Sequence, residues 1–341
     1  MNPMTAVLLY NLGGPTTLDE VEPFLTELFS DRDIIALPAG AMIQPAFGRA
    51  LAKWRAPSVR ENYRRIGGGS PIRASTAGQA RLLETRLNAG RGTRAGSFRV
   101  FVSMRYLKPS IGDALRKIRA EGITRIVTLS LFPHWSHATT GSWRHELERV
   151  LQSSEWRDAG FDVTDIDRYP AEPFYLDALA DTVRHALDRF SPAVRSDAVI
   201  LFSAHGLPQA LVDRGDPYVT DIEATRSGVW ERLRVSNRQL LGYQSRVGPV
   251  RWIGPGTDEL IDRLGQEGVK HLLIVPLSFV SDHIETLYEI DLLFAERAKR
   301  AGIRECLRSE ALNGHPGFIE ALGQLVERHL AAAGEPVRVF A

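Results

Sequence analysis

Short apolar runs alternate with amphipathic stretches along the chain. Apolar runs of about four to eight residues are typical of buried strands, and we expect strands over 6–12, 98–104, 124–131, 161–167, 197–204, 250–253, 271–278 and 303–310. Between them, apolar residues recur with the helical period, which predicts helices over 18–29, 74–89, 109–121, 142–153, 173–189, 220–241, 257–267, 285–301 and 315–333. This alternation indicates βαβ units and a mainly parallel sheet.

Four strands fall in each half of the chain, which predicts two similar α/β domains. At 341 residues the chain exceeds a single typical hydrophobic core. We place the domains at 1–170 and 171–341. Polar residues follow several of the strands directly, and ligands of open α/β sheets bind beyond the carboxyl ends of strands. We therefore expect these loops to face one cleft between the domains.

Composition narrows the class of protein. Lys and Arg number 42 against 41 Asp and Glu, a formal net charge of +1, so we expect no nucleic-acid partner. The single cysteine, Cys306, excludes an internal disulfide or a cysteine-ligated cluster supplied by one chain. The first basic residue is Arg32, so no export signal is expected. No apolar stretch approaches the roughly 20 residues of a membrane helix, and we expect a cytoplasmic protein.

An acidic run from Ser281 to Asp291 follows a predicted strand. On a helix, Asp282, Glu285 and Glu289 stand at i, i+3 and i+7 and share a face. One interpretation is a solvated acidic face favoured by the helix dipole. The alternative, suggested by His283 and the strand end, is a hydrated path for a divalent cation.

His205 stands at the tip of another predicted strand. Gly206 permits a sharp turn behind it, and Pro208 stops the strand from continuing. The imidazole is either hydrogen-bonded inside the turn or directed into the cleft, where it can act near neutral pH.

Two glycine-rich segments, Asn11–Pro15 and Tyr63–Ile72, lack the spacing of nucleotide-binding loops. This disfavours a nucleotide-dependent oxidoreductase. The segments are either flexible turns or places where the backbone and Ser70 contact a flat ligand or its carboxylates.

Taken in order, the motifs resemble the ferrochelatase family across nearly the whole chain. They are Asn11–Pro15, Leu28–Asp33, Tyr63–Ile72, Met104–Tyr106, Thr139–Gly141, Ser203–Pro208, Gly215–Tyr218, Gln244–Arg246, Gly248–Pro249 and Ser281–Asp291. The resemblance implies two Rossmann-like domains with parallel four-stranded sheets and a porphyrin cleft between them. It implies insertion of Fe²⁺ into protoporphyrin IX to form protohaem, with release of two protons, in haem biosynthesis.

The resemblance also implies site residues. His205 and Glu285 would be the catalytic and metal-handling groups, supported by Asp282, His283 and Glu289 in a helix that often contains a π-type turn in this family. Porphyrin contacts would be made by Leu12, Arg55, Ser70, Arg105, Tyr106, Trp252 and Phe279.

The chemistry suits these residue types. Imidazole accepts a proton near neutral pH, and carboxylate and imidazole are ligands for Fe²⁺. We assign His205 as proton acceptor with metal contact, and Glu285 as metal guide or second proton carrier; which group does which stays open. Bending the porphyrin out of plane would expose its nitrogen lone pairs, at the expense of binding interactions elsewhere on the ring.

Some positions depart from parts of the family. Cys306 alone cannot hold the iron–sulfur cluster of some relatives, so we expect no permanent cofactor. Leu293 shortens the acidic line, and Leu12 in place of Tyr favours protoporphyrin IX over coproporphyrin III. The segment 34–43, with Lys53–Arg55 after it, is interpreted as an apolar lip with a basic rim for a membrane surface, or as an ordinary packed loop.

Other functions remain open from the sequence. One is a chelatase for coproporphyrin III or another tetrapyrrole, with the same His and Glu chemistry. Another is a non-catalytic haem carrier, which would need an axial ligand but not the acidic row.

Overall fold

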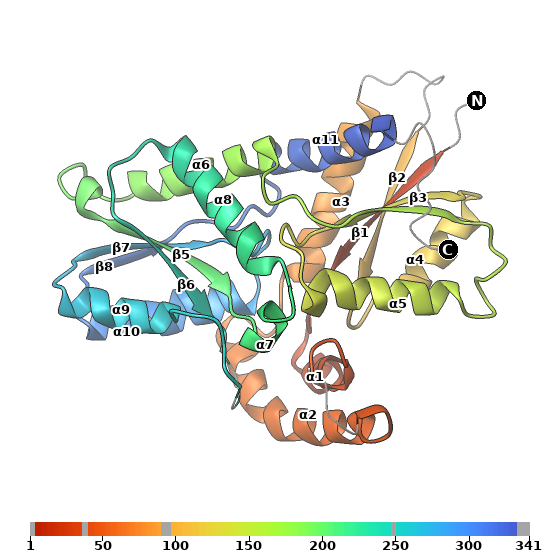
Figure 1. The fold of residues 1–341 in the computed structure, drawn as a ribbon, viewed down its shortest axis with the longest axis horizontal. Helices are drawn as coiled ribbons and strands as arrows, with labels where there is room; N and C mark the ends of the chain where they lie inside the picture. The colour runs from red at the N-terminus through yellow and green to blue at the C-terminus, as the bar shows by residue number, and fades with distance from the viewer. Residues whose placement is uncertain (1–3, 36–39, 90–96, 247, 249, 333–341) are drawn as a thin grey trace. The chain divides into compact units, whose positions relative to one another are not determined.

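The computed structural model describes residues 4–35, 40–89, 97–246, 248 and 250–332, drawn as a ribbon in Figure 1. The chain divides into two compact units. The first comprises Met1–Tyr169 with Phe318–Ala341, and the second comprises Pro170–Gly317.

The first unit is built on a parallel sheet with strand order β2-β1-β3-β4. Its strands are β1 (Thr5–Asn11), β2 (Phe98–Met104), β3 (Arg125–Ser130) and β4 (Asp162–Ile166). Its helices are η1 (Leu18–Glu20), α1 (Val21–Ser30), α2 (Gly40–Arg65), α3 (Ile72–Asn88), α4 (Ile111–Ala120), η2 (His137–Gly141), α5 (Ser142–Leu151) and α11 (Pro316–Ala332), of which the last begins at the end of the second unit. All seven residues of β1 are buried, as expected for a central parallel strand covered on both faces.

The second unit repeats this strand order as β6-β5-β7-β8, again fully parallel. Its strands are β5 (Val199–His205), β6 (Gln239–Gln244), β7 (His271–Pro276) and β8 (Glu305–Arg308). Its helices are α6 (Pro173–Asp188), η3 (Arg195–Asp197), α7 (Gln209–Val212), α8 (Tyr218–Leu233), α9 (Thr257–Gln266), η4 (Glu285–Phe294) and α10 (Ala295–Arg300). The predicted α/β class with two parallel four-stranded sheets is confirmed.

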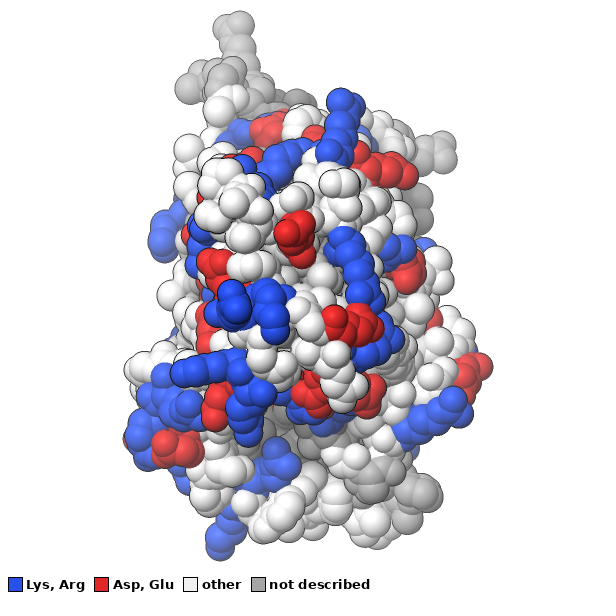
Figure 2. Space-filling model, turned by 90° about the vertical axis from the view of Figure 1, so that its left-hand side faces the viewer, with Lys and Arg blue, Asp and Glu red and all other residues white. Residues whose placement is uncertain are grey.

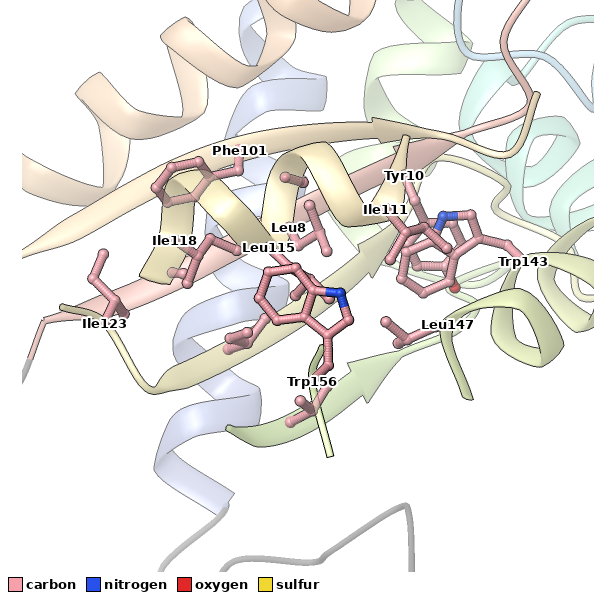
Figure 3. Packing of buried hydrophobic residues seen from close by; sticks show 14 residues of the cluster. Leu8, Tyr10, Phe101, Ile111, Leu115, Ile118, Ile123, Trp143, Leu147 and Trp156 are labelled. Carbon is pink, nitrogen blue, oxygen red and sulfur yellow. The ribbon is translucent and has the colours of Figure 1, made fainter. Parts of the chain in front are cut away.

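Aromatic packing fixes the core on one face of the first sheet (Figure 3). The Tyr10 and Trp143 rings stack with centroids 3.8 Å apart, between β1 and α5. Leu8 and Leu115 complete the same cluster and are fully buried. The Trp143 indole nitrogen donates to Ser103 Oγ over 3.2 Å, so its polar atom is satisfied in the core. This packing ties α4 and α5 to the strands whose carboxyl ends carry candidate ligand residues.

The C-terminal helix α11 belongs to the first unit, whereas the sequence placed 171–341 in one domain. Arg86 on α3 donates to Glu320 Oε2 over 2.5 Å and to Glu327 Oε2 over 3.0 Å, both on α11. Phe318 and Leu322 on the same helix are fully buried. The chain therefore returns to the first unit after the sheet of the second unit is complete.

One predicted strand and one predicted helix end were wrong. The sheet strand is β6, at Gln239–Gln244, and not residues 250–253. Helix α8 ends at Leu233, where Arg234 takes a left-handed conformation with φ of +51°, so the apolar residues after it are free to form β6. Trp252 instead forms an isolated bridge with Pro208.

Helix α2 replaces the loop predicted around the apolar lip. Residues 36–39 of the predicted lip lie outside the described residues, and Gly40 begins the helix. Two prolines inside it, Pro45 and Pro57, concealed it in the sequence because proline usually ends a helix. Met42 and Trp54 are strongly exposed, at 92% and 73%.

Charges are mixed over the surface. On the face shown in Figure 2, Lys and Arg side chains lie among Asp and Glu side chains. Ion pairs in the second unit include Arg297 with Asp262 at 2.6 Å and Arg246 with Asp258 at 2.8 Å. Within the part of the chain that the structure describes, no helix is long and apolar enough to cross a membrane.

Candidate functional site

His205 is the last residue of β5, the strand between β6 and β7 in the second sheet. Its backbone N–H donates to Ser278 Oγ over 2.9 Å, and its carbonyl accepts from the Tyr218 hydroxyl over 3.0 Å. Side chains thus hold the main chain at the position where the strand ends.

Hydrogen bonding also fixes the tautomer of His205. Nδ1 lies 2.6 Å from the Gly206 carbonyl oxygen, which only accepts, so Nδ1 carries the proton and Nε2 carries a lone pair in the neutral ring. Gly206 is required here because a Cβ would lie 2.8 Å from the Gln244 carbonyl oxygen and 3.2 Å from the Trp252 ring. The chain therefore turns sharply after the tip of the strand, as predicted, and the Trp252 ring lies close to this turn.

His283 lies between Phe279 and Glu285, beyond the end of β7. The Phe279 ring makes edge contacts with both histidines, with centroids 6.2 Å from His205 and 4.3 Å from His283. His283 Nδ1 lies 2.9 Å from the Ser281 carbonyl oxygen, and Nε2 lies 3.1 Å from Glu285 Oε2.

Each ring nitrogen of His283 therefore faces an acceptor. A neutral imidazole has only one N–H. With an ionised Glu285 carboxylate, a neutral His283 can therefore donate to only one of the two acceptors, and satisfying both requires one additional proton on the pair. Burial lowers the pKa of His283, against the opposing effects of the Glu285 carboxylate and the Ser281 carbonyl. Burial thus disfavours a proton on His283, and the His283 Nε2 and the Glu285 carboxylate form a pair of the donor types that bind a divalent cation.

Glu285 begins the π-helix η4, which agrees with the π-type turn implied by the resemblance. Glu289 lies one turn further, and three donors hold its carboxylate. Oε1 accepts from the Ser245 backbone N–H over 2.9 Å, and Oε2 accepts from the Ser245 hydroxyl and from Gln244 Nε2, the latter over 3.1 Å. Gln244 Nε2 also donates to the Glu285 carbonyl over 3.1 Å. The end of β6 therefore anchors the first turn of the π-helix.

Asp282 does not share a helical face with the two glutamates, contrary to the sequence prediction. It precedes the helix, and its carboxylate accepts from Arg308 over 3.0 Å, from Asn313 over 2.8 Å and from Thr286 over 3.1 Å. Its backbone N–H donates to Asn313 Oδ1 over 3.0 Å. Asp282 thus fixes the loop that carries His283.

In the first unit, four predicted porphyrin contacts come from loops that pack together. The Leu12 carbonyl accepts from the Tyr106 N–H over 2.9 Å, and the Asn11 carbonyl accepts from the Arg105 N–H over 2.9 Å. The Ser70 N–H donates to the Pro15 carbonyl over 2.7 Å. The glycines of Asn11–Pro15 permit this approach, since a Cβ on Gly14 would lie 3.1 Å from Ser70 Cβ.

Asp31 organises Arg105 and Tyr106. Its Oδ2 accepts from Arg105 Nη2 over 2.7 Å, from the Tyr106 hydroxyl over 2.7 Å and from Ser142 Oγ over 2.5 Å. Tyr106 is fully buried, so it supports Arg105 instead of presenting its own ring to a ligand. Arg105 also donates to Ser142 through Nε, and a guanidinium with five N–H groups keeps donors for a carboxylate.

Arg55, the remaining predicted contact, lies on α2. Its Nε is buried and has no hydrogen-bond partner among the residues that the structure describes, and its guanidinium carbon lies 5.9 Å from the centre of the Trp54 ring.

Several residues with clear structural roles were given no role from the sequence. Tyr218, Gln244 and Asp31 lie inside motifs that the sequence marked, but the bonds they make span 13 to 111 positions along the chain and leave no local pattern. Among the described residues, no group of three or more His, Cys, Asp or Glu side chains is arranged to hold a metal ion.

Comparisons with known proteins identify the family of this chain. A family model described as Ferrochelatase matches residues 4–330. Ferrochelatase of Geobacter metallireducens is 50% identical over 328 residues, covering 96% of this chain and 99% of that protein. Mitochondrial ferrochelatase of Bos taurus is 40% identical over 329 residues, covering 96% of this chain and 78% of that protein.

Among solved structures, the fold is similar to a sirohydrochlorin chelatase from Bacillus subtilis subspecies spizizenii in complex with cobalt. The TM-score is 0.55 at 13% identity, covering 99% of this chain and 100% of the other, and this likeness concerns the fold alone. The match over residues 4–330 and the extent of identity along whole relatives show the family. The chain belongs to the ferrochelatase family.

Proposed function

We propose that this ferrochelatase inserts Fe²⁺ into protoporphyrin IX, releasing two protons and forming protohaem in haem biosynthesis. The observation that carries the proposal is the arrangement at the ends of β5 and β7. There a histidine with a fixed tautomer stands near a His–Glu pair whose imidazole nitrogen and carboxylate are of the types that bind a divalent cation.

His205 is proposed as the proton acceptor. With Nδ1–H bound to the Gly206 carbonyl, Nε2 offers its lone pair to a pyrrole N–H, and protonation gives an imidazolium that keeps the Nδ1 bond. The ring need not reorient during transfer, which lowers the cost of reaching the transition state.

Glu285 is proposed to guide Fe²⁺ or to carry the second proton. Its carboxylate is partly accessible, with 24% of the side chain exposed, and its direct partner His283 is itself a possible ligand. Glu289, held by three donors, supports Glu285 by fixing the helix turn beneath it.

We propose the following contacts between the protein and the porphyrin. Leu12, Ser70 and Arg105 are proposed to contact the ring or its propionates, and Arg55 to meet a propionate through its guanidinium. Trp252 and Phe279 are proposed to line the pocket in the second unit. The leucine at position 12 favours protoporphyrin IX over the more carboxylated coproporphyrin III. No permanent cofactor is part of the proposal.

Contact with a membrane surface is the second part of the proposal. Ile43, Phe47 and Trp54 stand at i, i+4 and i+11 on α2, which places them on one helical face, and all three are exposed. The basic residues Arg49 and Lys53 lie on the same helix. An apolar face with basic residues beside it suits an anionic lipid surface, and we propose a cytoplasmic enzyme that attaches there.

The decisive experiment is anaerobic incubation of the protein with Fe²⁺ and either protoporphyrin IX or coproporphyrin III, followed by the porphyrin absorption spectrum. We expect turnover with protoporphyrin IX and at least tenfold lower kcat/KM with coproporphyrin III. His205→Ala is expected to bind porphyrin, measured by fluorescence quenching, but to lose metal insertion. Turnover by a folded His205→Ala variant would remove His205 from the mechanism, and equal rates with both porphyrins would refute the substrate assignment.

A further inference from the structure

On the side of β7, side chains hold the end of β5 beyond the last residue pair of the two strands. The β5–β7 ladder ends at Ser203 opposite Pro276, and the Ser203 carbonyl accepts from the Leu277 N–H over 2.9 Å. Because alternate residues of a strand direct their backbone groups to the same neighbour, the N–H and C=O of His205 point to the β7 side, beyond its last paired residue.

Opposite His205, two side-chain hydroxyls bind the backbone groups that β7 does not reach. The Ser278 hydroxyl oxygen accepts the His205 N–H over 2.9 Å, and the Tyr218 hydroxyl donates to the His205 carbonyl over 3.0 Å. The two bonds hold the peptide groups on both sides of His205: Ser278 binds the N–H, and Tyr218 binds the carbonyl.

The two hydroxyls differ in burial. Tyr218 is 5% exposed at the start of α8, in the segment Gly215–Tyr218, whereas Ser278 is partly buried. Burial raises the pKa of Tyr218, so its hydroxyl remains a donor at every pH at which the protein works. The single proton of this hydroxyl is donated to the His205 carbonyl, so Tyr218 acts on His205 and not on a substrate.

Resting on the proposed role of His205, we propose that Tyr218 and Ser278 are positioning residues that set the direction of the His205 Nε2 lone pair. Nδ1 is bound to the carbonyl of the very next residue, Gly206, so the ring direction follows the local backbone. If the His205 carbonyl loses the Tyr218 hydroxyl, the peptide plane between His205 and Gly206 is held at one end, through the Gly206 N–H that donates to the Gln244 carbonyl over 2.7 Å, and the direction of the imidazole is fixed less tightly. A displacement of about 1 Å at a reacting group can cost on the order of 100-fold in rate.

The test compares single, double and conservative variants in the full chain. Tyr218→Phe and Ser278→Ala are each expected to lower kcat by roughly 10- to 100-fold, while KM for Fe²⁺ and for protoporphyrin IX changes less than about twofold. The double variant is expected to lose more kcat than either single variant, because the two bonds hold different peptide groups of His205. Ser278→Thr, which keeps a hydroxyl, is expected to regain most of the lost kcat.

The control is Tyr243→Phe. Tyr243 is also a buried tyrosine, on the neighbouring strand β6, but the structure gives its hydroxyl no bond to His205. We expect its kcat to stay within about twofold of wild type. Circular dichroism checks folding of every variant. Should Tyr218→Phe not fold, the pair Ser278→Ala and Ser278→Thr tests the other bond, from the His205 N–H to Ser278.

A near-wild-type kcat for Tyr218→Phe, or a Ser278→Thr variant as slow as Ser278→Ala, would overturn the inference. Failure of the underlying function gives a different result, since His205→Ala would then retain turnover. In the inactive His205→Ala background, porphyrin affinity should be the same with and without Tyr218→Phe. An altered affinity would show that Tyr218 acts on the ligand directly.

Discussion

The carboxylate of Glu289 allows a sharp separation of structural from chemical roles in the π-helix. Glu289→Gln replaces one acceptor oxygen by an NH₂ group in a site lined by donors. If the amide oxygen stays at the position of Oε2, the NH₂ group faces the Ser245 backbone N–H; in the opposite orientation it faces Gln244 Nε2. At least one donor is thus left opposed to another donor.

The magnitude follows from these contacts. Losing a hydrogen bond to a charged acceptor and leaving a buried donor unpaired costs about 1–3 kcal/mol. A central value of about 2 kcal/mol corresponds to a fall in Tm of roughly 4–8 °C for a unit of this size. Glu285→Gln should cost much less stability, because in the described part of the chain the side chain of Glu285 is bound directly by one group, His283. Its activity should fall further, since the charge that meets Fe²⁺ is gone.

We therefore expect opposite rankings in two assays. Thermal unfolding followed by circular dichroism should place Glu289→Gln below Glu285→Gln in Tm. Fe²⁺ insertion at saturating porphyrin should place Glu285→Gln lowest in kcat/KM for Fe²⁺, with Glu289→Gln intermediate. Glu296→Gln, at an exposed position on α10, is the control and should match wild type in both. If Glu289→Gln unfolded at the wild-type temperature, or inserted iron more slowly than Glu285→Gln, the separation of roles would be wrong.

Two further predictions concern the first unit. Arg86→Met should lower the free energy of unfolding at pH 7 by about 1 kcal/mol, since the ion pairs are only partly buried. Hydrogen bonding to Arg86 lowers the pKa of Glu320 from 4.5 to about 2, so this stabilisation is fully present above pH 4.5. The difference in the free energy of urea unfolding between Arg86→Met and wild type should therefore shrink as the pH falls from 4.5 towards 2. A difference that stays constant over this range would contradict the prediction. Ile43→Ser with Trp54→Ser should reduce cosedimentation with phosphatidylglycerol vesicles on the order of tenfold. Leu82→Ser, an exposed leucine on α3, should leave cosedimentation unchanged, and equal binding by both variants would exclude α2 as the contact.

Elements whose signal lies in their own residues were predictable from the sequence. Strand β1 is a continuous buried run, and α4 begins with the capping pair Ser110 and Asp113. Strand β6 was missed because α8 ends on Arg234, and a left-handed arginine gives no sequence signal such as glycine gives. Helix α2 was missed because prolines interrupt it.

The candidate site divides in the same way. His205 and Glu285 were identifiable because each stands beside a strand end with distinctive neighbours. The partners of Asp282 were not, because Arg308 and Asn313 lie 26 and 31 residues further along the chain. A helical-face argument assumes that the helix has already begun at Asp282, and only the long-range bonds show that it has not.

The repeated strand order has a consequence for where an acid can stand in such a fold. In each unit the third strand of the chain leads through a loop into a π-helix: β3 into η2, and β7 into η4. At this matching place the second unit carries His283 and Glu285, whereas the first carries His137 and Thr139. The same connection therefore accepts an acid or a neutral residue, so the sequence of the loop, and not the strand order, decides which unit carries the acid.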